Sequence, residues 1–571
     1  MRLSMNAEKR PFKSVMFIAL IILSILVIRL FELQLLKGLY YKELSTDNHI
    51  RSVMIPAPRG IITDRNGVVL ADNTPAFNVS LVFAEFDIAN SERLAELLEM
   101  DKELVEERIQ FAASTPYKSI EIKIGLSVEE AGRVADNLYL LGGVSVEVRP
   151  QRRYPYGASF CHLIGYVGLA DSTRNFEGEL SGRSGLERIL NEELAGKYGY
   201  IREVVDAFGR IVEEVPGEEE QPIPGARFEL TIDSRLQLFA DSLIMQTGRP
   251  GAFVAINYET GELLVLSSVP GYDTNLFVGG ISAENWSQIL NNPFKPLLNR
   301  SWATAYPPGS TYKTVTASWL LESGIVDENT MPDPCYRSFH FAGSDFICWG
   351  THGRLNIVGA LAQSCDTYFY RTSMLGDMDE FAEFSSGYGM GAKTTDFLPG
   401  EAVGALPTRE LLNSIFGQGG WGLGNLMIAS IGQGEVLATP LQVALTSALI
   451  ASGGEMPHLA LFKSSIGTKR HWSINTSLET LETVREGMRQ AVSNSHGTLH
   501  RTLGYLPIQV YAKSGTAENG NNEDHAWVTG YIEEPLPIAF AVIIENGGSG
   551  GSVAGPVVAD FIEKVVTYET Q

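Results

Sequence analysis

The chain has 571 residues, of which 44% are hydrophobic and 19% are charged, and its formal net charge is -23. This length exceeds what one hydrophobic core normally organises, so we expect two or three folded units. The negative charge would repel nucleic acid phosphates and argues against a nucleic-acid-binding function. The four cysteines are too few for a disulfide scaffold.

The N-terminus carries an apolar run over residues 15–28, whose only polar member is Ser24, and the run continues more weakly to Leu36. We predict a transmembrane anchor over residues 13–36, which is long enough to span a bilayer. A cleaved signal peptide has an apolar core of similar length, but no small-x-small cleavage site follows here. Basic residues precede the span (Arg2, Lys9, Arg10, Lys13). They predict a cytoplasmic tail over residues 1–12 and a single-pass protein of the inner or plasma membrane with a periplasmic or extracytoplasmic body.

The next part of the chain predicts a structural module over residues 37–215. Residues 59–67 indicate two strands joined by a tight turn at Asn66-Gly67. Apolar spacing predicts a helix over residues 91–109, and another helix begins near Ser184 and runs to Leu194. No nucleophile stands beside a base in these pieces. An acidic stretch with Pro and Gly follows, so we place a linker at residues 216–228.

The remaining residues, 229–571, predict a second domain that opens with core strands. Residues 251–257 and 262–268 indicate a hairpin around Thr260-Gly261. Residues 306–309 (Tyr-Pro-Pro-Gly) then interrupt the chain just before Ser310, and residues 311–321 suit a helix. Ser310 would lie near the first turn of that helix, with Lys313 on the same face and within reach of its hydroxyl.

Three short motifs in this second domain carry the chemistry: Ser310-Thr-Tyr-Lys313, Ser364-Cys-Asp366 and Lys513-Ser-Gly-Thr516. A lone Ser-x-x-Lys is a weak signal. The second motif opens another helical stretch, and the third follows a strand-like stretch over residues 507–512. In the third motif, Gly515 would let a ligand approach the backbone, while Lys513, Ser514 and Thr516 would offer donors to an anionic group. The three motifs stand in the order that serine acyl-transferases binding penicillin use.

On these motifs, the chain resembles the class B penicillin-binding proteins, which are monofunctional peptidoglycan transpeptidases, over nearly its whole length. The resemblance implies a multidomain α+β or α/β fold. We therefore expect a single N-terminal transmembrane helix, a β-rich pedestal (dimerisation) domain over residues 37–215, and a transpeptidase domain over residues 229–571 with a central antiparallel sheet flanked by helices. Asp366 stands where many members have Asn. The Ser-x-Asp form resembles the elongation-specific branch, often called penicillin-binding protein 2, which partners a SEDS-type glycan polymerase.

The resemblance also implies a role for each motif residue. Ser310 would attack the penultimate D-alanine of a peptidoglycan stem peptide, with Lys313 as general base. Ser364 would relay a proton to the leaving amine and Lys513 would polarise it, while Ser514, Gly515 and Thr516 would bind the substrate and its terminal carboxylate. A neighbouring stem peptide would then complete the cross-link, and β-lactam antibiotics would acylate Ser310.

Some alternatives stay open at the sequence level. Asp366 is either an ion-pair partner of a lysine or a substrate contact. A division or sporulation role is the alternative within the same class. A penicillin sensor or β-lactamase, or a scaffold that activates a membrane polymerase, would be an alternative of another class.

A cluster of metal-ligand residue types lies between the first two motifs: Cys335, Cys348, His352 and Cys365. Three thiolates and one imidazole form a closed set suited to structural zinc. Some elongation-type family members carry zinc in this region. The alternatives are a Cys335–Cys348 disulfide and free thiols. No cofactor is required for the acyl-transfer chemistry itself.

Overall fold

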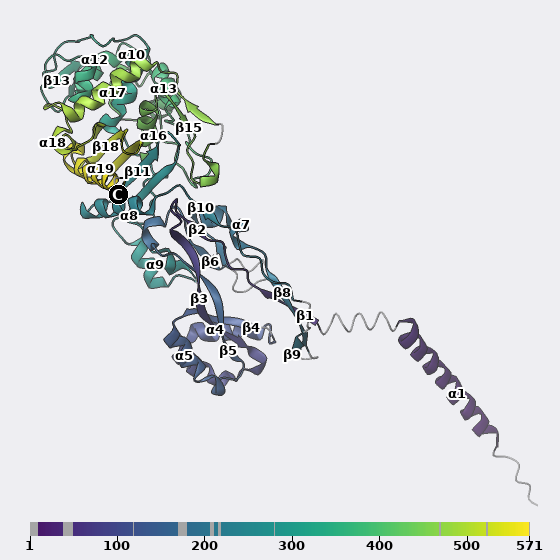
Figure 1. Ribbon diagram of the computed structural model, residues 1–571. Helices are drawn as coiled ribbons and strands as arrows, with labels where there is room; N and C mark the ends of the chain where they lie inside the picture. Colours follow the sequence, from purple (N-terminus) through teal and green to yellow (C-terminus); the bar gives the residue numbers. More distant parts are fainter. Residues whose placement is uncertain are drawn as a thin grey trace, which may run out of the picture. The chain divides into compact units, whose positions relative to one another are not determined.

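The computed structural model describes residues 9–37, 50–117, 119–169, 180–205, 211–214, 219–278, 280–467, 470–520 and 523–569 (Figure 1). Most of the expected cytoplasmic tail and part of the expected linker therefore lie outside the described residues. Helix α1 (Lys9–Phe31) continues into a π-helical turn, η1 (Glu32–Leu36). Its segment Val15–Leu36 has a mean hydropathy of 2.6 and no part of it is buried in the protein. By length and composition it is a candidate membrane span.

The described chain divides into two compact units that interleave in sequence. Unit 1 consists of Met1–Pro58, Ala76–Arg149 and Gly196–Pro224. Unit 2 consists of Arg59–Pro75, Pro150–Ala195 and Gly225–Gln571. Two segments from the N-terminal half therefore fold with the C-terminal half, which carries all three motifs.

Unit 1 contains a three-stranded antiparallel sheet in the order β1-β8-β9, made by Ile50–Ile55, Gly199–Val205 and Ile211–Glu214. A separate part is built from the second half of β3 (Val69–Val82), β4 (Ser119–Leu126) and β5 (Val144–Arg153) with helices α3, α4 and α5. The helix predicted over residues 91–109 is two helices, α3 (Ser91–Leu98) and α4 (Lys102–Ala113). The break occurs because Glu99 ends α3 in the left-handed conformation, at a φ of 50°. Helix α5 (Val128–Ala135) begins with a capping box at Ser127.

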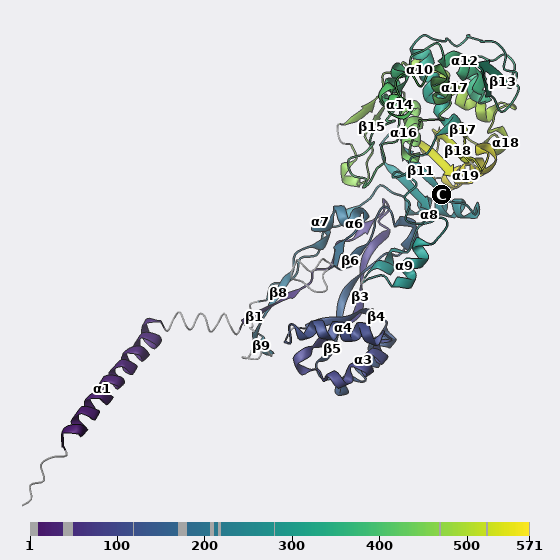
Figure 2. The same ribbon diagram turned by 180° about the vertical axis from the view of Figure 1, so that it is seen from behind.

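A five-stranded antiparallel sheet, in the order β12-β11-β19-β18-β17, forms the centre of unit 2 (Figures 1 and 2). It confirms the predicted central antiparallel sheet, and β11 and β12 are the predicted hairpin, with Gly261 at a φ of 77° in its turn. The strands β11, β12, β18 and β19 are buried at every position, which is why they are apolar without alternation. The strands are β11 (Gly251–Asn257), β12 (Leu263–Val269), β17 (Val510–Ala517), β18 (His525–Ile532) and β19 (Ile538–Ile544).

Helices cover both faces of this sheet, so alternate residues of each strand enter different cores. On one face, Phe253, Val528 and Val542 pack with the apolar residues of α8 (Ser234–Gln246) and α19 (Gly555–Glu569). On the other face, Val254 and Ala541 pack with α16 (Pro440–Ala451) and α10 (Lys313–Glu322).

Further helices of unit 2, all from its C-terminal segment, are α9 (Ala283–Leu290), α11 (Ile357–Ala362), α12 (Asp366–Ser373), α13 (Met378–Gly387), α14 (Arg409–Phe416), α15 (Leu423–Ser430), α17 (Leu478–Ser493) and α18 (His500–Leu503). Two small hairpins are β13 (Ser338–Phe341) with β14 (Ser344–Ile347), and β15 (Glu455–Pro457) with β16 (His471–Ser473).

The two N-terminal segments of unit 2 contribute to its main core. Strand β2 (Ile62–Thr63) pairs with the start of β3, as the turn at Asn66-Gly67 predicts, and runs parallel to β10 (Phe228–Glu229). Apolar side chains of both segments join the core that contains α10 and α16: Ile62, Leu70, Ala71, Tyr154, Phe160, Leu163, Ile164, Leu186 and Leu194. The helix predicted from Ser184 to Leu194 is two short helices, α6 (Gly185–Ile189) and α7 (Asn191–Ala195).

A buried ion cluster ties these segments together. Glu187 is fully buried and receives hydrogen bonds from Arg59 Nε at 2.5 Å and from Arg152 Nε at 2.6 Å. Asp64 accepts a hydrogen bond from the Ser234 hydroxyl at 2.7 Å and so connects the β2–β3 turn to the start of α8. Because Glu187 pairs with both guanidinium groups and Asp64 accepts hydrogen bonds, this polar interior is tolerated.

Candidate active site

Ser310 lies in a short 3-10 turn, η7 (Gly309–Tyr312), that leads directly into α10. Gly309 occupies the left-handed region at a φ of 55°, and its N–H donates to the Gly432 carbonyl at 2.9 Å. A Cβ at position 309 would lie 2.7 Å from the Thr516 carbonyl oxygen. The backbone around Ser310 is therefore in close contact with the third motif, at a position that only glycine fits.

Lys313 is the first residue of α10 and is completely buried. Its Nζ donates to Asp366 Oδ1 at 2.6 Å, to the Ser364 carbonyl at 3.0 Å and to Ser364 Oγ at 3.3 Å. Within the described residues, these bonds run to the second motif and not to Ser310. The geometry makes Asp366 an ion-pair partner of Lys313.

Ser364 lies between α11 and α12, in the left-handed region at a φ of 54°. For a non-glycine residue this conformation is uncommon and is held by its surroundings. Ser364 Oγ accepts a hydrogen bond from Lys513 Nζ at 2.8 Å, and Lys313 Nζ approaches the same oxygen at 3.3 Å. The hydroxyl thus lies between the amines of two fully buried lysines.

Lys513 lies on β17, where its Nζ also donates to the Ser514 carbonyl at 2.8 Å. Burial, and next the positive charge of Lys313, hold the pKa of Lys513 well below the usual value for a lysine. Burial raises the pKa of Asp366, an effect that the charge of Lys313 opposes. An amine with a lowered pKa can exist in the neutral form that accepts a proton.

The rest of the third motif continues β17, and β17 is an edge strand of the central sheet. Thr516 is exposed, whereas Ser514 is buried and donates from its Oγ to Thr498 Oγ1 at 2.7 Å. A Cβ at Gly515 would lie 2.9 Å from Thr311 Cγ2, so the glycine allows the two motifs to pack closely. An edge strand can pair its backbone with an extended peptide.

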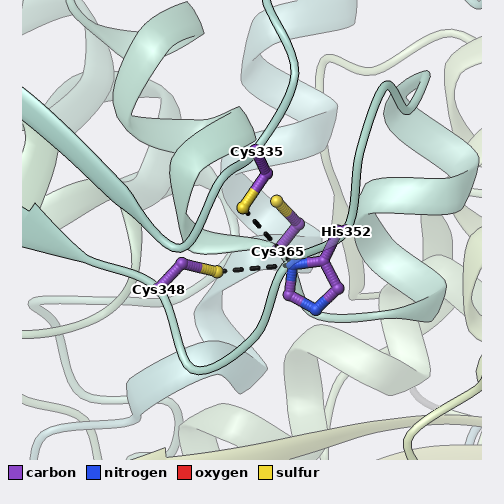
Figure 3. A group of neighbouring side chains, drawn as sticks. All are labelled: Cys335, Cys348, His352 and Cys365. Carbon is purple, nitrogen blue, oxygen red and sulfur yellow. Dashed lines mark hydrogen bonds between the residues drawn. The ribbon is translucent and has the colours of Figure 1, made fainter.

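The four predicted metal ligands meet in one place (Figure 3). Their ligand atoms all lie within 4.8 Å of one another. His352 Nδ1 is 3.6 Å from Cys335 Sγ and 3.4 Å from Cys348 Sγ, and the Cys365 sulfur points to the same space. A tetrahedral zinc with ordinary bond lengths would place N and S ligands about 3.6 Å apart. All four cysteines of the chain are free thiols and buried, Cys161 among them. The donor types and their spacing fit zinc.

Several contacts that support the site were not predicted from the sequence. Gln433 donates from its side-chain amide to the Thr516 carbonyl at 3.3 Å. Tyr306 donates from its hydroxyl to Glu545 at 2.6 Å, and Arg300 donates to the same carboxylate at 2.9 Å. These residues brace the chain just before Ser310 against the end of β19. The partners are far apart in sequence, so local spacing could not have identified these contacts.

Comparisons with known proteins agree with this geometry. Residues 251–563 match the model of the penicillin binding protein transpeptidase domain, and residues 54–230 match that of the penicillin-binding protein dimerisation domain. The chain belongs to the family of penicillin-binding proteins with a transpeptidase domain, and it is a D,D-transpeptidase.

The relatives specify the branch. The peptidoglycan D,D-transpeptidase MrdA of Acinetobacter baumannii is 34% identical over 96% of this chain and 87% of its own length. The complex between penicillin-binding protein 2 and MreC from Helicobacter pylori contains a chain with a TM-score of 0.81 and 28% identity, covering 91% of this chain and all of that one. A structure describing coordinated polymerization and crosslinking by a peptidoglycan synthase complex gives a TM-score of 0.72 at 30% identity, covering 97% of this chain and 98% of that one. This chain is of the penicillin-binding protein 2 type.

Proposed function

We propose that the protein cross-links peptidoglycan stem peptides through an acyl-enzyme on Ser310, during lateral elongation of the cell wall. The observation that carries this proposal is the position of Ser364 Oγ, within 2.8 Å of Lys513 Nζ and 3.3 Å of Lys313 Nζ. One hydroxyl that contacts two buried amines can pass a proton between them. A serine nucleophile activated by such a relay needs no metal or cofactor for acyl transfer.

The proton path follows from the charges. Lys313 is paired with Asp366 and must lose a proton before it can act as a base. In our proposal, Lys313 gives a proton to Ser364 Oγ while Ser364 gives its own proton to neutral Lys513. Neutral Lys313 then takes the proton of Ser310 as Ser310 attacks the penultimate D-alanine carbonyl.

Collapse of the tetrahedral intermediate releases the terminal D-alanine. Its amine takes a proton from Ser364, which Lys513 replaces, and Ser310 is left as an ester. The amine of a second stem peptide attacks this ester and gives a proton to neutral Lys513 through Ser364, while Lys313 returns its proton to Ser310. The cross-link forms and Ser310 is free.

The substrate would lie along β17. The backbone N–H groups of Ser310 and Thr516 would receive the oxyanion, and preorganised donors of this kind contribute about 3 kcal/mol each. The exposed Thr516 hydroxyl would bind the terminal carboxylate of the donor peptide, with Ser514 supporting it. The edge position of β17 leaves its backbone available to an extended peptide.

The test is intact-mass analysis after incubation with a penicillin, comparing the wild-type protein with Ser310→Ala. We expect a long-lived adduct in the wild type and none in Ser310→Ala. An adduct that clears within seconds would favour a β-lactamase, and no adduct in the wild type would favour a scaffold. Division and sporulation roles are less well supported, because the MrdA relatives and the penicillin-binding protein 2 structures are of the elongation type.

We also propose the partners and the topology of the elongation complex. The apolar helix α1 would anchor the chain in the inner membrane as a single span, with the N-terminus in the cytoplasm and both compact units outside. A SEDS-type glycan polymerase in the membrane and an MreC-like protein would bind the chain. Reconstituted polymerase should synthesise more glycan when the full-length chain is added, and a chain lacking residues 1–37 should give a smaller increase.

We further propose that Cys335, Cys348, His352 and Cys365 hold a structural zinc ion, which would fix the loop before α12 without taking part in acyl transfer. Elemental analysis should find one zinc per wild-type chain and less in Cys348→Ser. Removing the zinc should lower the melting temperature. A metal-free wild type in which thiol titration detects two fewer free thiols would favour the disulfide instead.

A further inference from the structure

Trp349 is an exposed aromatic residue beside the second motif, and the proposed chemistry does not use it. The residue is 61% exposed, although tryptophan is usually largely buried. It follows Cys348 directly and lies in the loop that leads to His352. The position therefore needs a reason other than core packing.

The indole N–H of Trp349 points at the backbone of the second motif. Nε1 donates to the Gln363 carbonyl at 3.1 Å and to the Ser364 carbonyl at 3.2 Å. The Ser364 carbonyl also accepts a hydrogen bond from Lys313 Nζ at 3.0 Å. Two side-chain donors, from Lys313 and Trp349, thus hold one carbonyl of a residue in the left-handed conformation.

The other side of Trp349 rests on the Cys/His cluster. Its ring meets the His352 ring edge to face, with centroids 4.9 Å apart at 62°. Gly350 lets the loop fold tightly, because a Cβ there would lie 3.1 Å from His352 Nε2. The cluster residues on either side of Trp349 in sequence thereby fix where its indole can lie.

We propose that Trp349 is a positioning residue that ties Ser364 to the Cys/His cluster. Its N–H holds the left-handed backbone of Ser364 so that Ser364 Oγ stays within hydrogen-bond distance of Lys513. The inference rests on the proposed acyl-enzyme chemistry and adds a component to it. Through Trp349, the cluster would support the second motif at a second place besides Cys365.

The test measures penicillin acylation by the full-length chain in detergent, separating the first-order acylation step k2 from the dissociation constant Ks of the preceding complex. Trp349→Phe keeps a ring and loses the N–H. We expect k2 to fall by about fivefold or more with Ks unchanged, because one hydrogen bond to the motif is lost. A changed Ks with an unchanged k2 would overturn the inference, since it would make Trp349 a wall of the binding cleft.

Trp472→Phe is the matched control. The Trp472 indole also donates to a backbone carbonyl, that of Gly387 at 3.1 Å, and its ring also lies beside a histidine, His458, at 5.5 Å. It should leave k2 unchanged. If the wild type is acylated and both variants share its k2, this inference fails while the proposed function stands. If the wild type is not acylated, the proposed function fails, and this inference fails with it.

A double-mutant cycle tests the link to the cluster. His352→Gln should lower k2 in the wild-type background and have little further effect in Trp349→Phe, because both changes release the same carbonyl. Fully additive losses would overturn the link. Cys348→Ser gives a second cycle if His352→Gln unfolds the protein, and melting temperatures identify that case.

Discussion

Replacing Asp241 with asparagine should make the free energy of unfolding less dependent on pH. Asp241 lies on α8, is 4% exposed, and accepts a hydrogen bond from the Ser267 hydroxyl. Its second carboxylate oxygen is also buried. Burial raises the pKa of Asp241 from 3.8 to about 7, although the Ser267 and Ser159 hydroxyls oppose the change.

The direction of the pH dependence follows from whether the folded or the unfolded state holds the proton. Folded Asp241 stays protonated up to about pH 7, whereas the unfolded chain releases the proton near pH 4. The contribution of Asp241 to the free energy of unfolding is therefore fully present below pH 4. It is lost progressively as the pH rises to 7. At about 1.4 kcal/mol per pH unit, the total loss is about 4 kcal/mol, and about 3 kcal/mol of it falls between pH 5 and 8.

Denaturant unfolding of the wild type and Asp241→Asn at pH 5, 6, 7 and 8 measures this effect. The stability difference between the two proteins should grow in favour of the variant by about 3 kcal/mol across that range. Ser267→Ala should move the inflection to higher pH, because it removes a hydroxyl that stabilises the ionised form. A difference that stays constant from pH 5 to 8 would refute the reasoning.

Three further predictions concern the core and the site. Glu187→Ala leaves two buried guanidinium groups without their carboxylate and should cost about 3–5 kcal/mol, measured by unfolding, whereas the exposed Glu192→Ala should change stability little. Gly309→Ala should abolish penicillin acylation, because the new Cβ would meet the Thr516 carbonyl at 2.7 Å; wild-type acylation would contradict this. Lys513→Met removes a buried amine and should lower the acylation rate by about 100-fold or more without lowering the melting temperature; a large drop in that temperature would instead make Lys513 a structural residue.

The three motifs could be placed from the sequence because each lies at the start or end of an element that neighbouring residues predict. Pro and Gly before Ser310 indicate a turn, and the apolar spacing after Lys313 indicates α10. The prediction that β11 and β12 form a hairpin also used only neighbouring residues. The Cys/His set could be predicted because three cysteines and a histidine in one short stretch are typical of a metal site. The structure brings the four ligand atoms together.

Other features could not be predicted, since they depend on pairs far apart in the chain. Arg59 and Glu187 are separated by 128 residues, and the sequence around one does not indicate that it pairs with the other. The grouping of residues 59–75 and 150–195 with the C-terminal half follows from such contacts. The role of Asp366 stayed open between an ion pair with a lysine and a substrate contact, because local spacing cannot show that its carboxylate lies 2.6 Å from the Lys313 amine.

The interleaving of the two units limits where the chain can be truncated. A fragment beginning at Gly225 would keep every motif residue but lose the side chains of Ile62, Leu70, Tyr154 and Leu186, each at most 3% exposed in the core shared with α10. It would present an uncovered apolar surface and aggregate during expression. A soluble catalytic protein for inhibitor screening should therefore begin before Arg59 and retain both early segments.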